Sequence, residues 1–297
     1  MIRLSSFPLT SLVLPILFFC CFWGDAQKVS SQSLLDELGQ EELMVRPVSS
    51  TFKDTRIINV QSNETPGANV LHFVIAHRFG QINEGAYALW GLDNASMRMA
   101  FDYGITDRLC IGIARSTYQK TFEGSLKWRA LRQNTDNSIP FSITLYSVSM
   151  ANGLVWSDPN RENNFRHRLS YTHQAIIAKK WGQKLSLALI PSITHRNLVE
   201  SLSDSHDQWT LGGGGRYKVS NRASINLEYH YLLAGLPDAS VNSLSIGMDI
   251  ETGGHVFQLH MTNSQGMFER AFLTETSGTW RDGAVFFGFN LSRVFDF

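Results

Sequence analysis

The chain has 297 residues, with 26 basic and 26 acidic side chains and therefore a formal net charge of zero. Apolar residues make up 43% of it and charged residues 18%, below the roughly 25% of charged residues in soluble domains. This composition excludes a disordered chain, which needs low hydrophobicity and high net charge. The balanced charge also argues against a nucleic-acid partner, because nucleic-acid binding needs a basic surface.

The N-terminus has the pattern of a secretory signal peptide. Arg3 supplies the positive start, an apolar run follows at residues 11–23, and the small residues of Gly24-Asp-Ala-Gln27 offer a cleavage site. We therefore expect residues 1–27 to be removed on export. An uncleaved membrane anchor is the alternative, but the apolar run is short and Pro15 interrupts it.

Cleavage also changes the cysteine content. Cys20 and Cys21 leave with the signal peptide, so the exported chain keeps Cys110. A single cysteine forms neither an internal disulfide nor a cysteine-based zinc site. The stability of the exported chain must therefore come from its fold.

Residues 28–67 are predicted to be an N-terminal extension. A short helix is expected near 31–44, where leucines and a methionine share one side and three glutamates mark the other. A polar connector then leads to Pro66 and Gly67. The remaining residues, 68–297, form the predicted main domain.

From residue 68 the chain consists of apolar and polar residues that alternate in runs of about ten, separated by clusters of Gly, Asn, Asp and Ser. In one run, Met97 and Phe101 share a face while Arg98 and Asp102 share the other. This period of two predicts an all-β fold. The runs number about twelve and begin near residues 69, 95, 108, 123, 140, 165, 184, 207, 222, 240, 254 and 284.

A soluble sandwich and a transmembrane barrel both show this alternation, because their apolar faces point inward and outward respectively. The connections favour a closed antiparallel transmembrane β-barrel of about twelve strands, since short and long ones largely alternate as periplasmic turns and outer loops do. The connection near 133–139 fits this scheme less well. Short connections occur near 106–107, 182–183, 220–221 and 252–253, and long ones near 80–94, 152–164, 197–206 and 264–283.

Aromatic residues support the membrane interpretation. Most tryptophans lie near predicted strand ends, where aromatic girdles meet the membrane interfaces. The last strand, which should pair with the first to close the barrel, carries Phe295 and the terminal Phe297. Such an ending resembles the signal read by the outer-membrane barrel insertion machinery. That machinery and outer-membrane lipid are therefore expected partners, and the buried last strand of a soluble protein is the alternative.

Three stretches also resemble one protein family, an outer-membrane β-barrel family of the Bacteroidota known as domain of unknown function 5777. The resemblance covers residues 48–297 and implies an exported outer-membrane barrel. No activity is established for that family, so it transfers no catalytic residue. The stretches are Thr51-Phe-Lys-Asp-Thr-Arg-Ile-Ile-Asn-Val60, Trp90-Gly-Leu-Asp-Asn-Ala-Ser-Met-Arg-Met-Ala-Phe-Asp-Tyr-Gly-Ile-Thr-Asp107 and Gly288-Phe-Asn-Leu-Ser-Arg-Val-Phe295.

The polar face of the predicted strands would line the barrel interior, and it carries charges of both signs. A narrow conduit and a lumen closed by ion pairs are equally supported, because twelve strands lie between filled eight-stranded barrels and open porins. The candidate lumen-lining residues are Arg98, Asp102, Lys127, Arg129, Arg168, Arg216, Glu228, His230, Asp249 and His260.

Four consecutive glycines, at residues 212–215, lie inside a predicted strand. They lack the Lys-Ser/Thr and the helix of a phosphate-binding loop. Glycines in a strand instead indicate bending or the close approach of another segment. The helix near 34–44 or the connector near 51–60, entering the lumen, is a candidate for that segment.

One stretch has enzymatic character. His260 and Thr262 share a strand face, as a base and a nucleophile would, and the stretch loosely resembles the His-x-Ser-Asn-Gly of outer-membrane phospholipase A. A threonine replaces the serine, however, and the alternation places His260 in the lumen, away from lipid. His167, His173 and His195 are too widely scattered for a metal site, so no enzyme, cofactor or metal is expected.

The sequence therefore predicts a passive narrow pore or a structural component of the outer membrane. Two alternatives from other classes are a barrel-embedded lipid hydrolase and a docking partner for a periplasmic protein. In the docking alternative, residues 28–65 would be the contact element.

Overall fold

The computed structural model describes residues 45–199, 201, 204–235 and 240–297. The predicted signal peptide at 1–27 and the helix predicted near 31–44 lie outside these described residues. Among the helices of the described ranges, none has the length and apolar character of a membrane span.

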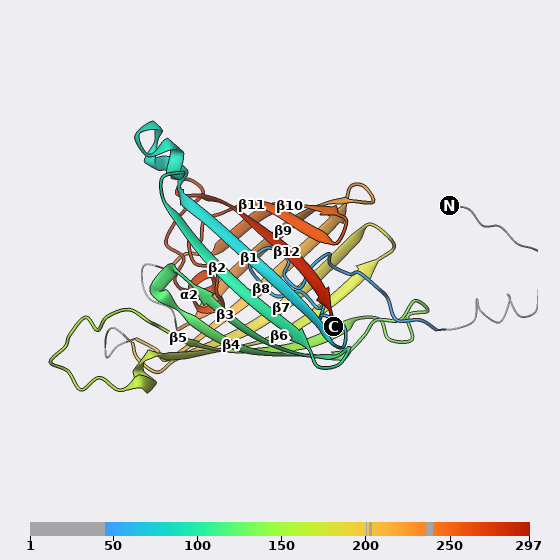
Figure 1. Cartoon of the computed structure of the whole chain (residues 1–297), viewed down its shortest axis with the longest axis horizontal. Helices are drawn as coiled ribbons and strands as arrows, with labels where there is room; N and C mark the ends of the chain where they lie inside the picture. Colours follow the sequence, from blue (N-terminus) through green and yellow to red (C-terminus); the bar gives the residue numbers. More distant parts are fainter. Residues whose placement is uncertain (1–44, 200, 202–203, 236–239) are drawn as a thin grey trace, which may run out of the picture. The chain divides into compact units, whose positions relative to one another are not determined.

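Twelve antiparallel strands of the described chain form one closed barrel (Figure 1). Each strand pairs with its neighbours in the sequence, and the last strand pairs with the first. The strands are β1 (Val70–Gln81), β2 (Ala95–Gly104), β3 (Leu109–Ser116), β4 (Phe122–Leu131), β5 (Ser142–Ala151), β6 (Leu169–Trp181), β7 (Leu185–Arg196), β8 (Asp207–Lys218), β9 (Ala223–Ala234), β10 (Ser243–Thr252), β11 (His255–Thr262) and β12 (Phe286–Asp296).

The predicted all-β barrel is confirmed, and the predicted strand starts agree closely with the observed ones. The largest difference is at β6, which was predicted from 165 and begins at Leu169. The residues before it form a short 3-10 helix instead. The short helices are η1 (Ile82–Glu84), η2 (Ala86–Gly91), η3 (Tyr118–Lys120), η4 (Phe165–Arg168) and α2 (Glu269–Thr274).

The seam between β1 and β12 closes the barrel, as the sequence predicted. Val70 lies opposite Asp296 and Leu71 lies opposite Phe295. The backbone N–H of Phe297 donates to the carbonyl of Asn69 at 3.3 Å. Pairing therefore continues to the last residue, which suits a membrane environment where unpaired backbone groups are costly.

Most short connections lie at one end of the barrel, and the longest ones lie at the other end. The turn end carries the start of β1, the end of β12 and the connections 105–108, 132–141, 182–184, 219–222 and 253–254. The loop end carries the longer connections 82–94, 152–168 and 263–285. The connection at 132–141 is longer than its neighbours at the turn end, which explains its poor fit to the sequence pattern.

The alternation of most strands separates a mainly polar buried face from an exposed apolar one. In β2, Arg98 is 4% exposed and Phe101 is 42% exposed, and in β9 Glu228 is 0% exposed beside Leu227 at 52%. The polar face points into the barrel and the apolar face points outward. This is the pattern of a membrane barrel and the reverse of a soluble sandwich.

The connection between β11 and β12 differs from the outer loop that the sequence predicted. Its helix α2 lies inside the barrel, and all six of its residues are buried. Phe272 and Leu273 pack against the inward side chains of Tyr146 and Ile190. The strands β5, β6 and β7 contribute apolar inward side chains to this cluster, including Val148, Ile176 and Ile190, so α2 completes a hydrophobic core within the lumen.

Candidate functional site

The lumen holds most of the predicted lining residues. Asp102 is half-buried on the inner side of β2, where its carboxylate occupies the space in front of Gly112. Eight others are buried on the inner strand faces: Arg98, Lys127, Arg129, Arg216, Glu228, His230, Asp249 and His260.

Arg168 is the exception and lies outside the lumen. It is the last residue of η4, and its guanidinium donates to the carbonyls of Asn152 at 2.8 Å and Leu154 at 2.5 Å. It also stacks over the ring of Trp156 at 3.9 Å. The prediction of a lumenal Arg168 is wrong, because β6 begins one residue after it.

Residues 51–66 fold back into the barrel, and we call them the lumenal hairpin. Arg56 and Gln61 form an antiparallel bridge, and the N–H of Ile57 donates to the carbonyl of Val60 at 2.8 Å across the tip. Phe52, Ile57 and Val60 are almost completely buried. The chain enters the lumen from the turn end and returns to it before β1 begins (Figure 1).

Glu228 of β9 holds the tip of the lumenal hairpin. Its Oε2 accepts hydrogen bonds from the backbone N–H groups of Ile58, Asn59 and Val60, at 3.1, 2.9 and 3.1 Å. Its other oxygen, Oε1, lies 3.0 Å from Nε2 of His230. The carboxylate is 0% exposed, so these charge-assisted bonds offset the cost of burying it.

Amide side chains of the wall donate to the carbonyls of the hairpin tip. Asn290 donates to the carbonyl of Ile58 at 3.0 Å, and Gln258 donates to that of Ile57 at 3.0 Å. Asn59 donates from its own amide to Ser245 at 2.9 Å. The tip is therefore held by polar contacts on several sides.

Basic side chains hold the two arms of the lumenal hairpin. Lys127 donates to the carbonyl of Thr55 at 3.0 Å and to Oε1 of Gln61 at 2.9 Å. Arg129 pairs with Glu64 at 3.2 Å. At the entrance, Arg216 donates to the carbonyl of Thr51 at 3.1 Å. The basic side chains of the lumen therefore bind the lumenal hairpin instead of solvent.

Further charges are neutralised in pairs within the lumen. Arg98 and Glu123 form a bidentate pair at 2.8 and 2.7 Å. Nε2 of His72 lies 2.8 Å from Oδ1 of Asp54 on the hairpin. Such pairing is required because isolated buried charges are costly. It agrees with the ion-paired lumen that the sequence allowed.

Close packing at one glycine of β8 shows how the hairpin fits. A side chain at Gly214 would begin where the Cδ1 atom of Ile57 lies, and 3.6 Å from its Cγ1. The four-glycine stretch of β8 therefore admits the connector near 51–60, as the sequence suggested. The neighbouring Gly213 has open space in front of it.

His260 is buried in the lumen beside Arg78. It is 2% exposed, and its Nε2 lies 2.9 Å from the guanidinium of Arg78. Thr262 accepts from Ser245 at 2.8 Å and so takes part in the lumen's hydrogen bonding. Both residues are enclosed by the barrel wall, away from lipid.

Sequence reasoning missed several lumen residues that contact the hairpin. Arg78 is 1% exposed and donates to Asn59 at 2.8 Å, and Gln258 and Asn290 are buried as well. Arg78 shares its strand face with His72, so the alternation could have identified it. The uncharged amides carried no comparable signal, because a polar residue on a predicted inner face is expected anyway.

A family model described as a membrane bound beta barrel domain (DUF5777) matches residues 52–295. The chain belongs to this family. The match begins at Phe52, so the lumenal hairpin is part of the family's domain together with the strands. The resemblance seen in the sequence is confirmed for the family and its membrane location.

Several solved structures are similar to the chain. The NanC porin shows 7% identity and a TM-score of 0.49, over 75% of this chain and 98% of that one. An outer membrane channel from Pseudomonas putida F1 shows 14% identity and a TM-score of 0.45, over 78% of this chain and 97% of that one. LpxR from Salmonella typhimurium shows 11% identity and a TM-score of 0.37, over 77% of this chain and 100% of that one. A search of curated proteins finds no significant match.

Proposed function

We propose that the protein is an outer-membrane pore whose lumen is held closed by the lumenal hairpin. In this state the hairpin and α2 fill the described barrel. Opening requires the hairpin to leave its position, and small hydrophilic solutes then pass along the wall that it covered. The role is non-enzymatic.

The polar character of the wall behind the hairpin carries this proposal. Glu228, Ser245, Gln258 and Asn290 face the tip and are buried by it. A permanent plug would be expected to meet an apolar wall on all sides, whereas the hairpin does so on one side, where Ile57 and Val60 join the apolar cluster around Tyr146. A polar wall can be wetted when the hairpin leaves, as in barrels that conduct water and solutes.

The path of the chain permits such a movement. Both arms of the lumenal hairpin leave the barrel at the turn end, at Ser50 and at Pro66. The hairpin can therefore be withdrawn without threading any chain through the barrel. A pocket of about 290 Å³ remains at this end, between Phe52, Asp54 and the ends of β11 and β12.

The exposed wall would carry charges of both signs, including Glu228, Asp249 and Arg216. We therefore expect weak selection between small anions and cations. The finer expectations from the sequence belong to this proposal: a Bacteroidota source, a cleaved signal at 1–27, location in the outer membrane, and insertion by the barrel insertion machinery. A periplasmic protein that engages the extension at 28–65 would supply the force for withdrawal.

Planar-bilayer recording tests the proposal. The full chain should show little conductance, whereas replacing residues 52–63 by a Gly-Ser linker of equal length should produce channel openings. Heat-modifiable migration on gels verifies that both barrels are folded. Folded barrels of the linker variant that stay silent would contradict the pore and leave a structural membrane component as the function.

A further inference from the structure

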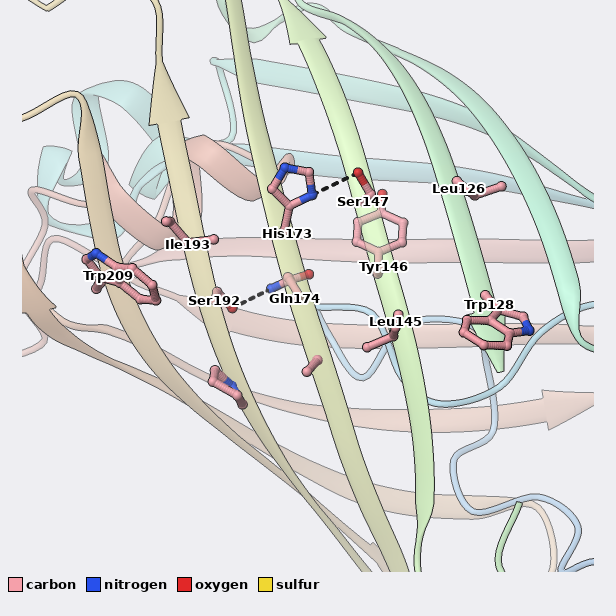
Figure 2. Close-up of a pocket in the computed structure, with 12 residues that line it drawn as sticks. Leu126, Trp128, Leu145, Tyr146, Ser147, His173, Gln174, Ser192, Ile193 and Trp209 are labelled. Atoms are coloured by element: carbon pink, nitrogen blue, oxygen red, sulfur yellow. Dashed lines mark hydrogen bonds between the residues drawn. The ribbon is translucent and has the colours of Figure 1, made fainter. Parts of the chain in front are cut away.

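The outer face of the barrel carries an apolar groove across β4 to β8 (Figure 2). Its volume is about 500 Å³, within the range of pockets that hold small organic ligands. Trp128 and Trp209 stand at its two sides (Figure 2). The small side chains of Ala175 and Pro191 also line it. Because the outward face of a membrane barrel contacts lipid, this groove is surrounded by lipid acyl chains.

Two polar side chains lie within the groove. Ser147 of β5 and His173 of β6 are directly opposite in register, and Oγ of Ser147 lies 3.0 Å from Nδ1 of His173 (Figure 2). Polar groups are costly on a lipid-facing surface. Their mutual hydrogen bond reduces this cost, but the hydroxyl keeps the capacity for a further bond to a ligand.

The groove is also a place where the strand ladder is interrupted. The pairing of β6 with β7 passes from Gln174 opposite Ser192 to Ile177 opposite Leu189, and the residues between are not paired. Pro191 lies in this gap and has no N–H to donate. A proline inside a central strand is disfavoured, so its presence marks a locally specialised surface.

Polar residues continue from the groove toward the loop end. Ser149 lies opposite Tyr171, whose ring stacks on that of His195 at 6.3 Å. His195 in turn lies 2.7 Å from Asp207. The outer face therefore changes from apolar in the groove to charged at the rim, which matches the profile of a lipid lying along the strands.

The depth of Ser147 selects the chemistry of that lipid. Ser147 lies four residues before the end of β5 at Ala151, which places it roughly 10 Å below the loop end of the strand, given about 3.3 Å per residue and a strand tilt near 40°. That is deeper than the ester that joins an acyl chain to its headgroup. The matching oxygen must therefore be carried by the chain itself.

We propose that the groove binds a membrane lipid whose acyl chain carries a hydroxyl group, which hydrogen-bonds to Ser147 and His173. Binding is favoured over hydrolysis, because the described residues place no carboxylate or amide against the second ring nitrogen of His173. A serine nucleophile activated by histidine needs such a third group to orient the imidazole. The inference is independent of the lumenal hairpin and of conduction.

Photo-crosslinking in phosphatidylcholine vesicles tests this site. Two diazirine-bearing phosphatidylcholine probes are compared, one with a mid-chain hydroxyl and one without, and crosslinked peptides are mapped by mass spectrometry. The hydroxylated probe should be enriched on β5–β7 peptides by about three-fold or more, the contribution of one hydrogen bond inside a membrane. The peptides of β2 and β3 should show no such preference.

Matched variants separate the groove from the rest of the surface. Ala175→Trp fills the groove and should abolish the enrichment, whereas Ile113→Trp, at an outward position of β3, should leave it intact. In His173→Phe, crosslinking of the β5–β7 peptides by the hydroxylated probe should fall to the level given by the probe without a hydroxyl. Heat-modifiable migration confirms that each barrel is folded.

Four results would overturn the proposal. The two probes could label β5–β7 equally, labelling could be uniform around the barrel, or Ala175→Trp could leave the enrichment unchanged. Turnover of the probe that disappears in Ser147→Ala would also overturn it, by making the groove a hydrolase site.

Discussion

Arg56 and Glu269 approach each other to 3.0 Å in the lumen, although they belong to segments that enter the barrel from opposite ends. Arg56 lies on the lumenal hairpin, which comes from the turn end, and Glu269 begins α2, which comes from the loop end. Their side chains are 7% and 0% exposed. This ion pair therefore joins the lumenal hairpin to α2.

Removing one charge of this pair should be costly. Glu269→Gln leaves the Arg56 guanidinium buried without its counter-charge, and we expect a loss of about 3–5 kcal/mol in the free energy of unfolding. The double variant Arg56→Met with Glu269→Met should recover much of this loss, because an apolar pair needs no charge compensation. Urea unfolding in detergent micelles measures both. A double variant less stable than Glu269→Gln would contradict this account.

Two adjacent glycines offer a matched test of how the hairpin fits. Gly214→Val should displace Ile57, because its new side chain begins in the space that Ile57 occupies. Gly213→Val points outward into open space and should be neutral. We expect limited proteolysis to cut between residues 51 and 66 at least several-fold faster in Gly214→Val than in Gly213→Val. Equal cleavage rates would show that the hairpin does not depend on this contact.

The orientation of the strands predicts a difference between two outward positions. Leu227 lies inside β9, whereas Tyr217 lies next to the end of β8, where we expect the membrane interface. Arginine should cost about 2–4 kcal/mol at position 227 if it lies near the bilayer midplane, and about 0–1 kcal/mol at position 217. Equilibrium unfolding in lipid vesicles tests this. A harmless Leu227→Arg would speak against lipid contact at that face.

The closing seam predicts how the C-terminus contributes to assembly. Removing residues 294–297 deletes the pairs Leu71 with Phe295 and Val70 with Asp296, and it removes the predicted insertion signal. We expect this truncation, and more mildly Phe297→Ala, to lower the amount of heat-modifiable protein in outer-membrane fractions. Undiminished insertion of the truncated chain would refute a role for this terminal strand.

The fold was predictable because strand alternation is a local signal. Arg98 and Phe101 lie an odd number of positions apart and so take opposite faces, and the same rule placed Glu228 and Leu227 correctly. The prediction for Arg168 failed because the start of β6 depends on how the preceding loop turns, and the alternation of residues does not encode this. The six residues of α2 were missed because so short a helix has little periodicity of its own.

The contacts of the site depend on long-range register and could not be read from the sequence. Glu228 meets Asn59 across 169 residues, and Ser147 meets His173 only because β5 and β6 pair in one particular register. His173 was dismissed as one of several scattered histidines. The glycines at 212–215 were the exception, because their missing side chains indicated that another segment approaches.

A reversible disulfide between the hairpin tip and the wall tests the central claim most directly. A Cβ atom at Gly214 lies 3.6 and 3.7 Å from the Cγ atoms of Ile57, so the double variant Ile57→Cys with Gly214→Cys has a geometry close to that of a disulfide. Conductance is recorded in a planar bilayer before and after a reductant is added. The account predicts a barrel that is silent when oxidised and opens on reduction, because a free thiol at position 57 holds the tip less firmly than the native isoleucine does. Equal conductance in the two states would contradict a pore that is closed by its lumenal hairpin.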